Sequence, residues 1–186
     1  NEVMLQQIKA KHGKALGLVC SNGEFGERLI QQAQSLGLRF RVYAEDWGQC
    51  FQAERLAAHA QDTTWMAAVH GETSTGCLNG LSLFTDHKTR AQPDYTLAMD
   101  GVSSFGALPF SLANVDFASA TSGKVLGALA GLSMVFYHQA VETQAEQGTY
   151  CQLACYDWQT PFTLPAYLLA NLLAALAAYP QPYADF

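Results

Sequence analysis

The stretch Ala15-Leu-Gly-Leu-Val-Cys20 decides the class of fold, because it is an apolar run of strand length with a helical pattern directly behind it. In that pattern, apolar residues recur at the spacing of one helix face at Leu29, Ile30, Ala33 and Leu36. Gly37 then stands where a glycine commonly ends a helix. A buried strand followed by an amphipathic helix is the unit from which α/β proteins are built.

The same alternation continues along the rest of the chain. Further apolar runs of strand length are Arg39–Tyr43, Thr64–Val69, Tyr95–Met99, Asp116–Ala120 and Leu132–Tyr137. Helical spacing recurs over Phe51–Ala60 and Ala166–Ala178. We therefore predict one α/β domain over residues 1–186, with a mostly parallel central sheet and helices on both faces, in three layers.

The composition is that of a globular domain without a surface for polyanions. The 186 residues are 49% hydrophobic and carry a net charge of −6, which argues against binding to nucleic acid. The apolar stretch Leu164–Tyr179 is slightly short for a membrane span, so we expect a buried helix there and no membrane partner. The five cysteines lack the spacing of a zinc site, and we expect reduced thiols that are buried or partly buried.

Polar stretches follow four of the predicted strands. Ser21–Arg28 follows the first strand, His70–Gly76 the third, Asp100 the fourth and Lys124 the fifth. The carboxyl ends of parallel strands meet at one edge of a sheet, where open α/β folds bind their ligands. The sequence therefore predicts a single ligand site built from these four loops.

Two of these residues have side chains suited to a carbonyl-bearing, cationic ligand. Lys124 stands in Thr121-Ser-Gly-Lys124, and a lysine amine can form an imine with an aldehyde once it is deprotonated. Asp100 ends a buried strand, where a carboxylate needs a partner such as a protonated pyridine nitrogen. The alternatives are an ordinary solvated lysine and a turn or helix-capping aspartate.

Together, His70-Gly-Glu-Thr-Ser-Thr-Gly76, Asp100-Gly-Val-Ser-Ser-Phe-Gly106 and Thr121–Lys124 resemble one family. They resemble the class V aminotransferases of pyridoxal 5'-phosphate (PLP) fold type I. The 2-aminoethylphosphonate–pyruvate and alanine/serine–glyoxylate transaminases are the nearest in this respect. The resemblance implies that Lys124 carries PLP and acts as the base, while Asp100 holds the pyridine nitrogen.

The resemblance also implies cofactor contacts for other residues. Phe25 and Val102 would cover the two faces of the ring, with a core aromatic as the alternative for Phe25. Thr73 would lie near the phenolic oxygen, with Ser74 or Thr75 as alternatives. Thr163 would reach the phosphate in the neighbouring subunit of a homodimer, although it could instead cap the last helix. His70 and Glu72 would order their loop through hydrogen bonds.

The implied reaction is the transfer of an amino group from a small amino donor to a 2-oxo acid such as pyruvate or glyoxylate, in the cytoplasm. A PLP-dependent lyase or desulfurase of the same fold, or a truncated non-catalytic remnant, are the alternatives. Relatives carry a Gly-Ser-Gly-Thr phosphate loop before a helix that looks like Asn1–Leu5, and a small domain after Tyr179. We therefore expect a chain truncated at both ends that binds PLP weakly.

Overall fold

A computed structural model describes residues 1–91, 93–108, 110–138 and 164–179. The helices are α1 (Glu2–His12), α2 (Glu24–Ser35), α3 (Ala53–His59), α4 (Leu81–Arg90) and α5 (Ala166–Ala177). The strands are β1 (Gly17–Ser21), β2 (Phe40–Ala44), β3 (Trp65–Val69), β4 (Gly71–Glu72), β5 (Cys77–Leu78), β6 (Thr96–Asp100), β7 (Phe117–Thr121) and β8 (Ser133–Tyr137).

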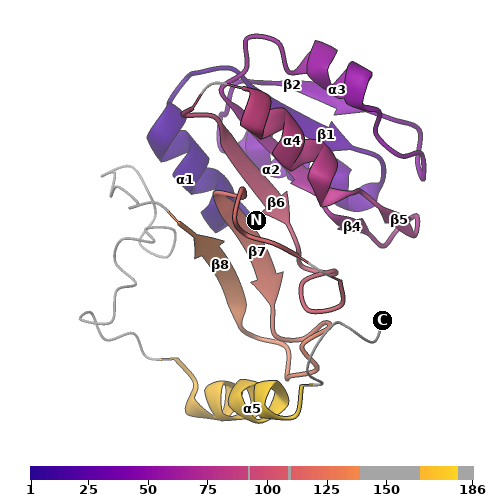
Figure 1. The fold of residues 1–186 in the computed structure, drawn as a ribbon. Helices are drawn as coiled ribbons and strands as arrows, with labels where there is room; N and C mark the ends of the chain where they lie inside the picture. Colours follow the sequence, from indigo (N-terminus) through magenta and orange to yellow (C-terminus); the bar gives the residue numbers. More distant parts are fainter. Residues whose placement is uncertain (92, 109, 139–163, 180–186) are drawn as a thin grey trace.

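The main sheet has six strands in the order β2-β1-β3-β6-β7-β8 (Figure 1). The first five strands in this order run parallel, and only β8 is antiparallel to its neighbour β7. Crossovers between parallel strands need a connection long enough to return to the same end of the sheet. Helices α2, α3 and α4 provide three of these connections, and the described residues between β6 and β7 provide the fourth without a helix. The short strands β4 and β5 form a separate antiparallel hairpin.

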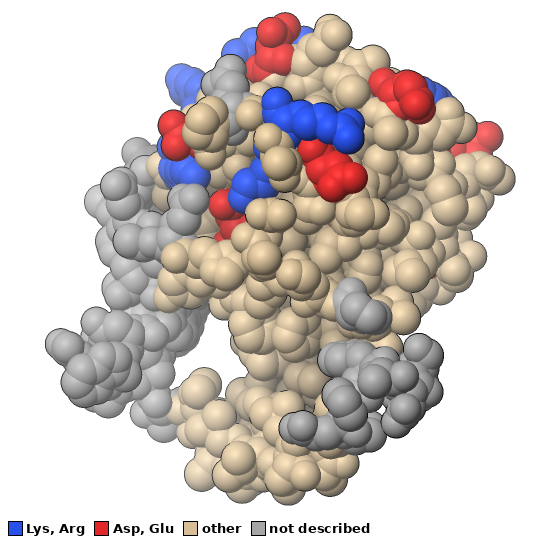
Figure 2. Space-filling model, in the orientation of Figure 1, with Lys and Arg blue, Asp and Glu red and all other residues tan. Residues whose placement is uncertain are grey.

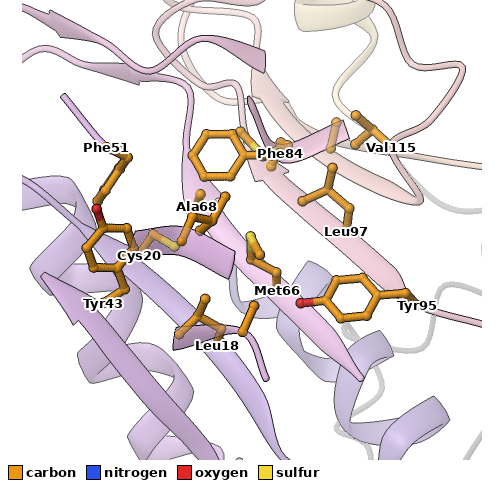
Figure 3. Packing of buried hydrophobic residues seen from close by; sticks show 14 residues of the cluster. Leu18, Cys20, Tyr43, Phe51, Met66, Ala68, Phe84, Tyr95, Leu97 and Val115 are labelled. Atoms are coloured by element: carbon orange, nitrogen blue, oxygen red, sulfur yellow. The ribbon is translucent and has the colours of Figure 1, made fainter. Parts of the chain in front are cut away.

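The two faces of the sheet pack two separate hydrophobic cores, because successive side chains of a strand point to opposite faces. Leu18, Met66 and Leu97 belong to the core on the side of α3 and α4, shown in Figure 3. Their sequence neighbours Val19 and Ala98 belong to the other core, which also holds residues of α1 and α2. The prediction of a three-layer α/β fold with a mostly parallel sheet is therefore confirmed.

Two elements were absent from the sequence-based prediction. Helix α4 was missed because, along most of its length, it carries polar residues, and only Phe84 among its side chains is buried. The hairpin β4–β5 was missed because each of its strands is only two residues long. The hairpin follows β3 directly. Strand β4 lies within the stretch His70–Gly76, and β5 begins immediately after that stretch.

The expectation of a buried C-terminal helix was wrong. Only Leu168 of α5 is buried, while Tyr167 is 66% and Leu173 is 70% exposed. The helix is apolar on every side. Only the side that carries Leu168 is covered, because it packs against the turn near Gly131. On the face shown in Figure 2, no charged side chain is visible on α5. Within the described ranges, no helix is both long enough and apolar enough to span a membrane.

The expectation for the thiols is met in part. Cys20 and Cys77 are buried, but Cys50 is exposed, because it lies in the loop after β2 and not in a strand. Cys151 and Cys155 lie outside the described residues.

Candidate functional site

The four loops named from the sequence follow four strands that are consecutive in the sheet. These strands are β1, β3, β6 and β7, all parallel, so their carboxyl ends lie at one edge (Figure 1). In the register of the sheet, Asp100 stands between Val69 of β3 and Ser119 of β7. This edge is the candidate site, and Asp100 lies near its centre.

Asp100 is buried, with 5% of its surface exposed, and each of its oxygens accepts a hydrogen bond. Val102 N donates to Oδ1 at 2.9 Å, and Asn1 Nδ2 donates to Oδ2 at 2.6 Å. Ser119 Oγ in turn donates to Asn1 Oδ1 at 2.7 Å. Both donors to Asp100 are neutral groups. Among the described residues, no cationic side chain forms an ion pair with this carboxylate.

Lys124 lies three residues beyond the end of β7, and its side chain is exposed. Its loop is closed by the buried Ser122, whose Oγ donates to Leu129 O at 2.6 Å and accepts from Leu132 N at 3.2 Å. Lys124 and Asp100 therefore follow adjacent strands of the sheet. In the described part of the chain, no hydrogen bond or ion pair joins these two side chains.

Glu72 orders the site through the start of α2. Its fully buried carboxylate accepts from Gly26 N at 2.9 Å, from Phe25 N at 3.4 Å and from Ser74 Oγ at 2.6 Å. The first backbone N–H groups of a helix have no partner inside the helix, and a carboxylate there also meets the positive end of the helix dipole. Gly23 leaves room for this carboxylate, since a Cβ atom at Gly23 would lie 2.5 Å from Glu72 Cγ.

His70 joins the loop after β3 to the loop after β6. Its Nδ1 is hydrogen-bonded to Ser104 Oγ at 2.8 Å, and the edge of its ring meets Phe110 with the ring centroids 4.9 Å apart. Burial lowers the pKa of His70, so the imidazole is held neutral. Glu72 thus bonds Ser74 within its own loop, as the resemblance implied, and both His70 and Glu72 also bind neighbouring segments.

The other residues named for the cofactor occupy different environments. Phe25 is half-buried at the start of α2, packs against the core on the α1 and α2 side, and has Arg28 Cζ 5.2 Å from its ring centroid. Val102 is half-buried beside Asp100, and Thr73 is exposed. Thr163 lies outside the described residues. The structure therefore brings Asp100 and Val102 into direct contact, and it places Phe25 in the first turn of α2 and Thr73 in the turn between β4 and β5.

Sequence reasoning missed three polar residues of this edge. Asn1 and Ser119 make the contacts to Asp100 described above, and Asn1 is far from Asp100 in the sequence. Asn22 lies within the stretch Ser21–Arg28 but was not singled out there, yet its buried side chain donates to Asn79 Oδ1 at 2.8 Å. A polar side chain directly at a strand end was the available signal for Asn22.

Comparison with known proteins gives relatives but no matching family model. A 2-aminoethylphosphonate–pyruvate transaminase from Pseudomonas putida (strain W619) is 31% identical over 198 residues, covering 97% of this chain and 52% of that protein. A transaminase of the same name from Pseudomonas fluorescens (strain Pf0-1) is 32% identical and covers 96% and 51%. The chain therefore spans about half the length of the curated relatives it matches.

Solved structures of aminotransferases also superpose on this chain. The alanine–glyoxylate aminotransferase from Nostoc sp. superposes with a TM-score of 0.82 at 27% identity, covering 95% of this chain and 50% of that one. The ureidoglycine–glyoxylate aminotransferase from Bacillus subtilis superposes with a TM-score of 0.85 at 21% identity, covering 96% of this chain and 49% of that one, which shows a shared fold. The resemblance to these aminotransferases stated from the sequence is confirmed.

Proposed function

We propose that this chain is the PLP-binding large domain, over residues 1–186, of a class V aminotransferase of fold type I. The enzyme transfers an amino group from a small amino donor to a 2-oxo acid. One observation carries the proposal: four consecutive parallel strands bring the loops of Phe25, Thr73, Asp100 and Lys124 to one edge of the sheet. The similarity to transaminases over nearly the whole chain supports it.

The residues at this edge fit PLP. Within the described residues, the buried Asp100 carboxylate accepts from two neutral donors and forms no ion pair, and a buried charge without an opposite charge is costly. A protonated pyridine nitrogen supplies that opposite charge. Each carboxylate oxygen has a second acceptor position, so the ring nitrogen can join Val102 N and Asn1 Nδ2 as donors.

The roles of the other residues follow from their places. Bound PLP supplies an electron sink for negative charge at the substrate α-carbon. The exposed Nζ of Lys124 is accessible to the aldehyde of the cofactor and, once released, can accept the α-proton of the donor. Phe25 and Val102 cover the ring, Thr73 lies near its phenolic oxygen, and Thr163 binds the phosphate across a homodimer.

The relatives suggest the substrates to test. Transaminases named for 2-aminoethylphosphonate and pyruvate are the curated relatives, and the Nostoc neighbour is named for alanine and glyoxylate. We propose 2-aminoethylphosphonate or alanine as donor, pyruvate or glyoxylate as acceptor, and the cytoplasm as the location. These names favour amino transfer over the lyase and desulfurase alternatives.

Borohydride reduction of the PLP-treated chain tests the assignment of Lys124. Peptide mapping should find the reduced cofactor on Lys124, and Lys124→Ala should lose that label. Lys14→Ala is the matched control, because Lys14 is also exposed but precedes β1 at the opposite edge of the sheet. A label that survives in full in Lys124→Ala would show that another lysine carries the cofactor.

A further inference from the structure

Two thiols from separate segments meet beside the candidate site. Cys50 Sγ lies 3.7 Å from Cys77 Sγ. Cys50 belongs to the loop between β2 and α3, and Cys77 begins β5 of the hairpin that follows β3. In the hairpin register, Cys77 is the residue opposite Glu72, which holds the start of α2.

A buried amide holds both thiol-bearing segments in place. Asn22 Nδ2 donates to Gln49 O at 2.9 Å, next to Cys50, and to Cys77 Sγ at 3.3 Å. Gly48 N donates back to Asn22 O at 3.1 Å. Asn22 therefore holds the segment of Cys50 through Gln49 O and Gly48 N, while its longer contact with Cys77 Sγ shares the two amide protons with Gln49 O and Asn79 Oδ1.

The two thiols differ in their access to solvent. Cys50 is exposed, whereas Cys77 keeps only 8% of its surface exposed. Burial, followed by the contact with Cys50, raises the pKa of Cys77, which favours its neutral thiol. Cys50 is accordingly the thiol that meets an oxidant from solution, and Cys77 is the thiol that resolves the product.

We propose that Cys50 and Cys77 form a redox-sensitive pair that closes to a disulfide when the protein meets a hydroperoxide. The Cys50 thiol loses its proton and its sulfur attacks one oxygen of hydrogen peroxide. The O–O bond breaks, a sulfenic acid forms on Cys50, and the departing hydroxide takes up a proton and leaves as water. Cys77 then loses its proton and attacks the Cys50 sulfur, and the S–O bond breaks with release of a second water. The two thiols are oxidised by two electrons, and hydrogen peroxide is reduced to two waters.

The disulfide would fasten the loop after β2 to the hairpin β4–β5. The sulfurs must close from 3.7 Å to the bonded distance of about 2.05 Å. Cys50 lies in a stretch without helix or strand, so this segment can supply the movement. Closure of this disulfide requires no bound cofactor and no transaminase activity.

Peptide mapping after peroxide treatment tests the pair. The full chain with Cys151→Ser and Cys155→Ser keeps Cys20, Cys50 and Cys77 as its only thiols. Mild hydrogen peroxide, followed by alkylation and non-reducing digestion, should yield a linked Cys50–Cys77 peptide that dithiothreitol separates. Cys20→Ala is the matched control, since Cys20 is buried in the core, and it should leave the yield of this peptide unchanged.

A second variant separates the two chemical steps. Cys77→Ser should leave Cys50 as a sulfenic acid that dimedone traps, in several-fold higher yield than in the parent chain. Equal dimedone labelling in both chains would show that Cys77 does not resolve Cys50. A linked peptide that never forms, or a Cys50 that stays unreacted with peroxide, would also overturn the proposal.

Discussion

At the scale of single residues, Glu72 joins two parts of the site. Its buried carboxylate accepts the N–H groups of Phe25 and Gly26 in the first turn of α2, so the position of Phe25 depends on a residue that lies after β3. Hydrogen bonds to a charged group contribute about 1.5–3 kcal/mol, and a buried N–H left without a partner adds a penalty.

We expect Glu72→Ala to lower the free energy of unfolding by about 3 kcal/mol, because Gly26 N and Phe25 N lose their acceptor. Glu24→Gln is the control, since the Glu24 side chain forms only an exposed pair with Arg28 and should cost less than about 1 kcal/mol. Urea unfolding measures both variants. Equal losses would show that the buried carboxylate contributes nothing beyond a surface charge.

His12 makes the fold sensitive to acid. Its Nε2 is hydrogen-bonded to Thr96 Oγ1 at 2.8 Å, and burial, with a smaller effect of Lys11, lowers the pKa of His12 from 6.5 to about 4. Above pH 6.5 the ring is neutral in both the folded and the unfolded chain, so protonation of His12 does not lower the free energy of unfolding. Between that pH and about 4, the unfolded chain binds the proton more strongly, and stability falls.

We expect the free energy of unfolding to decrease as the pH is lowered from about 7 to about 4.5, with His12→Gln losing less over this range than the parent chain. The slope from one such group is at most about 1.4 kcal/mol per pH unit, and the part of His12 still in contact with solvent reduces it. The pKa of His70 is also lowered by burial, so some acid sensitivity should persist. Parallel profiles for the two proteins would contradict the role of His12.

At the scale of elements, the contact between β1 and β3 leaves no space at Gly17. Gly17 and Trp65 are partners in the parallel register, and the indole lies over the glycine. A Cβ atom at Gly17 would stand 1.9 Å from Trp65 Cε2. Trp65 is fully buried between β1 and the core on the α1 and α2 side, so its ring cannot move aside without displacing neighbours.

We expect Gly17→Ala to cost about 1–3 kcal/mol of unfolding free energy, because a methyl group overpacks this site. Gly80→Ala is the matched control, since the nearest atom to a Cβ there is Ser82 Oγ at 3.9 Å, and it should cost less than about 1 kcal/mol. Chemical unfolding of both variants, with Trp fluorescence as the signal, makes the comparison. An unchanged free energy of unfolding in Gly17→Ala would mean that Trp65 can repack freely.

At the scale of the whole molecule, α5 presents an apolar surface. On the face shown in Figure 2, the charged side chains lie away from this helix. Exposed apolar side chains lie together on that helix, among them Tyr167, Leu169, Leu173 and Leu176. A contiguous apolar surface of this kind promotes association between molecules.

We expect the isolated chain to associate with increasing concentration, and Tyr167→Lys combined with Leu173→Lys to shift it toward monomer. These side chains are 66% and 70% exposed, so the double variant should unfold at nearly the same denaturant concentration as the parent. Leu168→Lys is the control, because Leu168 is buried and a charge there should destabilise the fold. Sedimentation velocity that shows no change in the double variant would contradict the prediction.

The sequence by itself determined the class of fold and the edge that carries the site. Strands such as β1 and β3 are encoded by consecutive apolar residues, and α2 by the spacing of Leu29, Ile30 and Ala33. The places of Asp100 and Lys124 at strand ends follow from the same local pattern, as does the resemblance to aminotransferases. Each of these features depends on residues that are close in the chain.

Only the tertiary structure decided which distant residues meet. The bond between Asn1 and Asp100 spans 99 positions, and the contact between Cys50 and Cys77 spans 27. Both depend on the order β2-β1-β3-β6-β7-β8, which local hydrophobic periodicity does not contain. The exposure of α5 also depends on tertiary structure. An apolar sequence indicates that a helix can be buried, but the elements that pack against it determine whether it is buried.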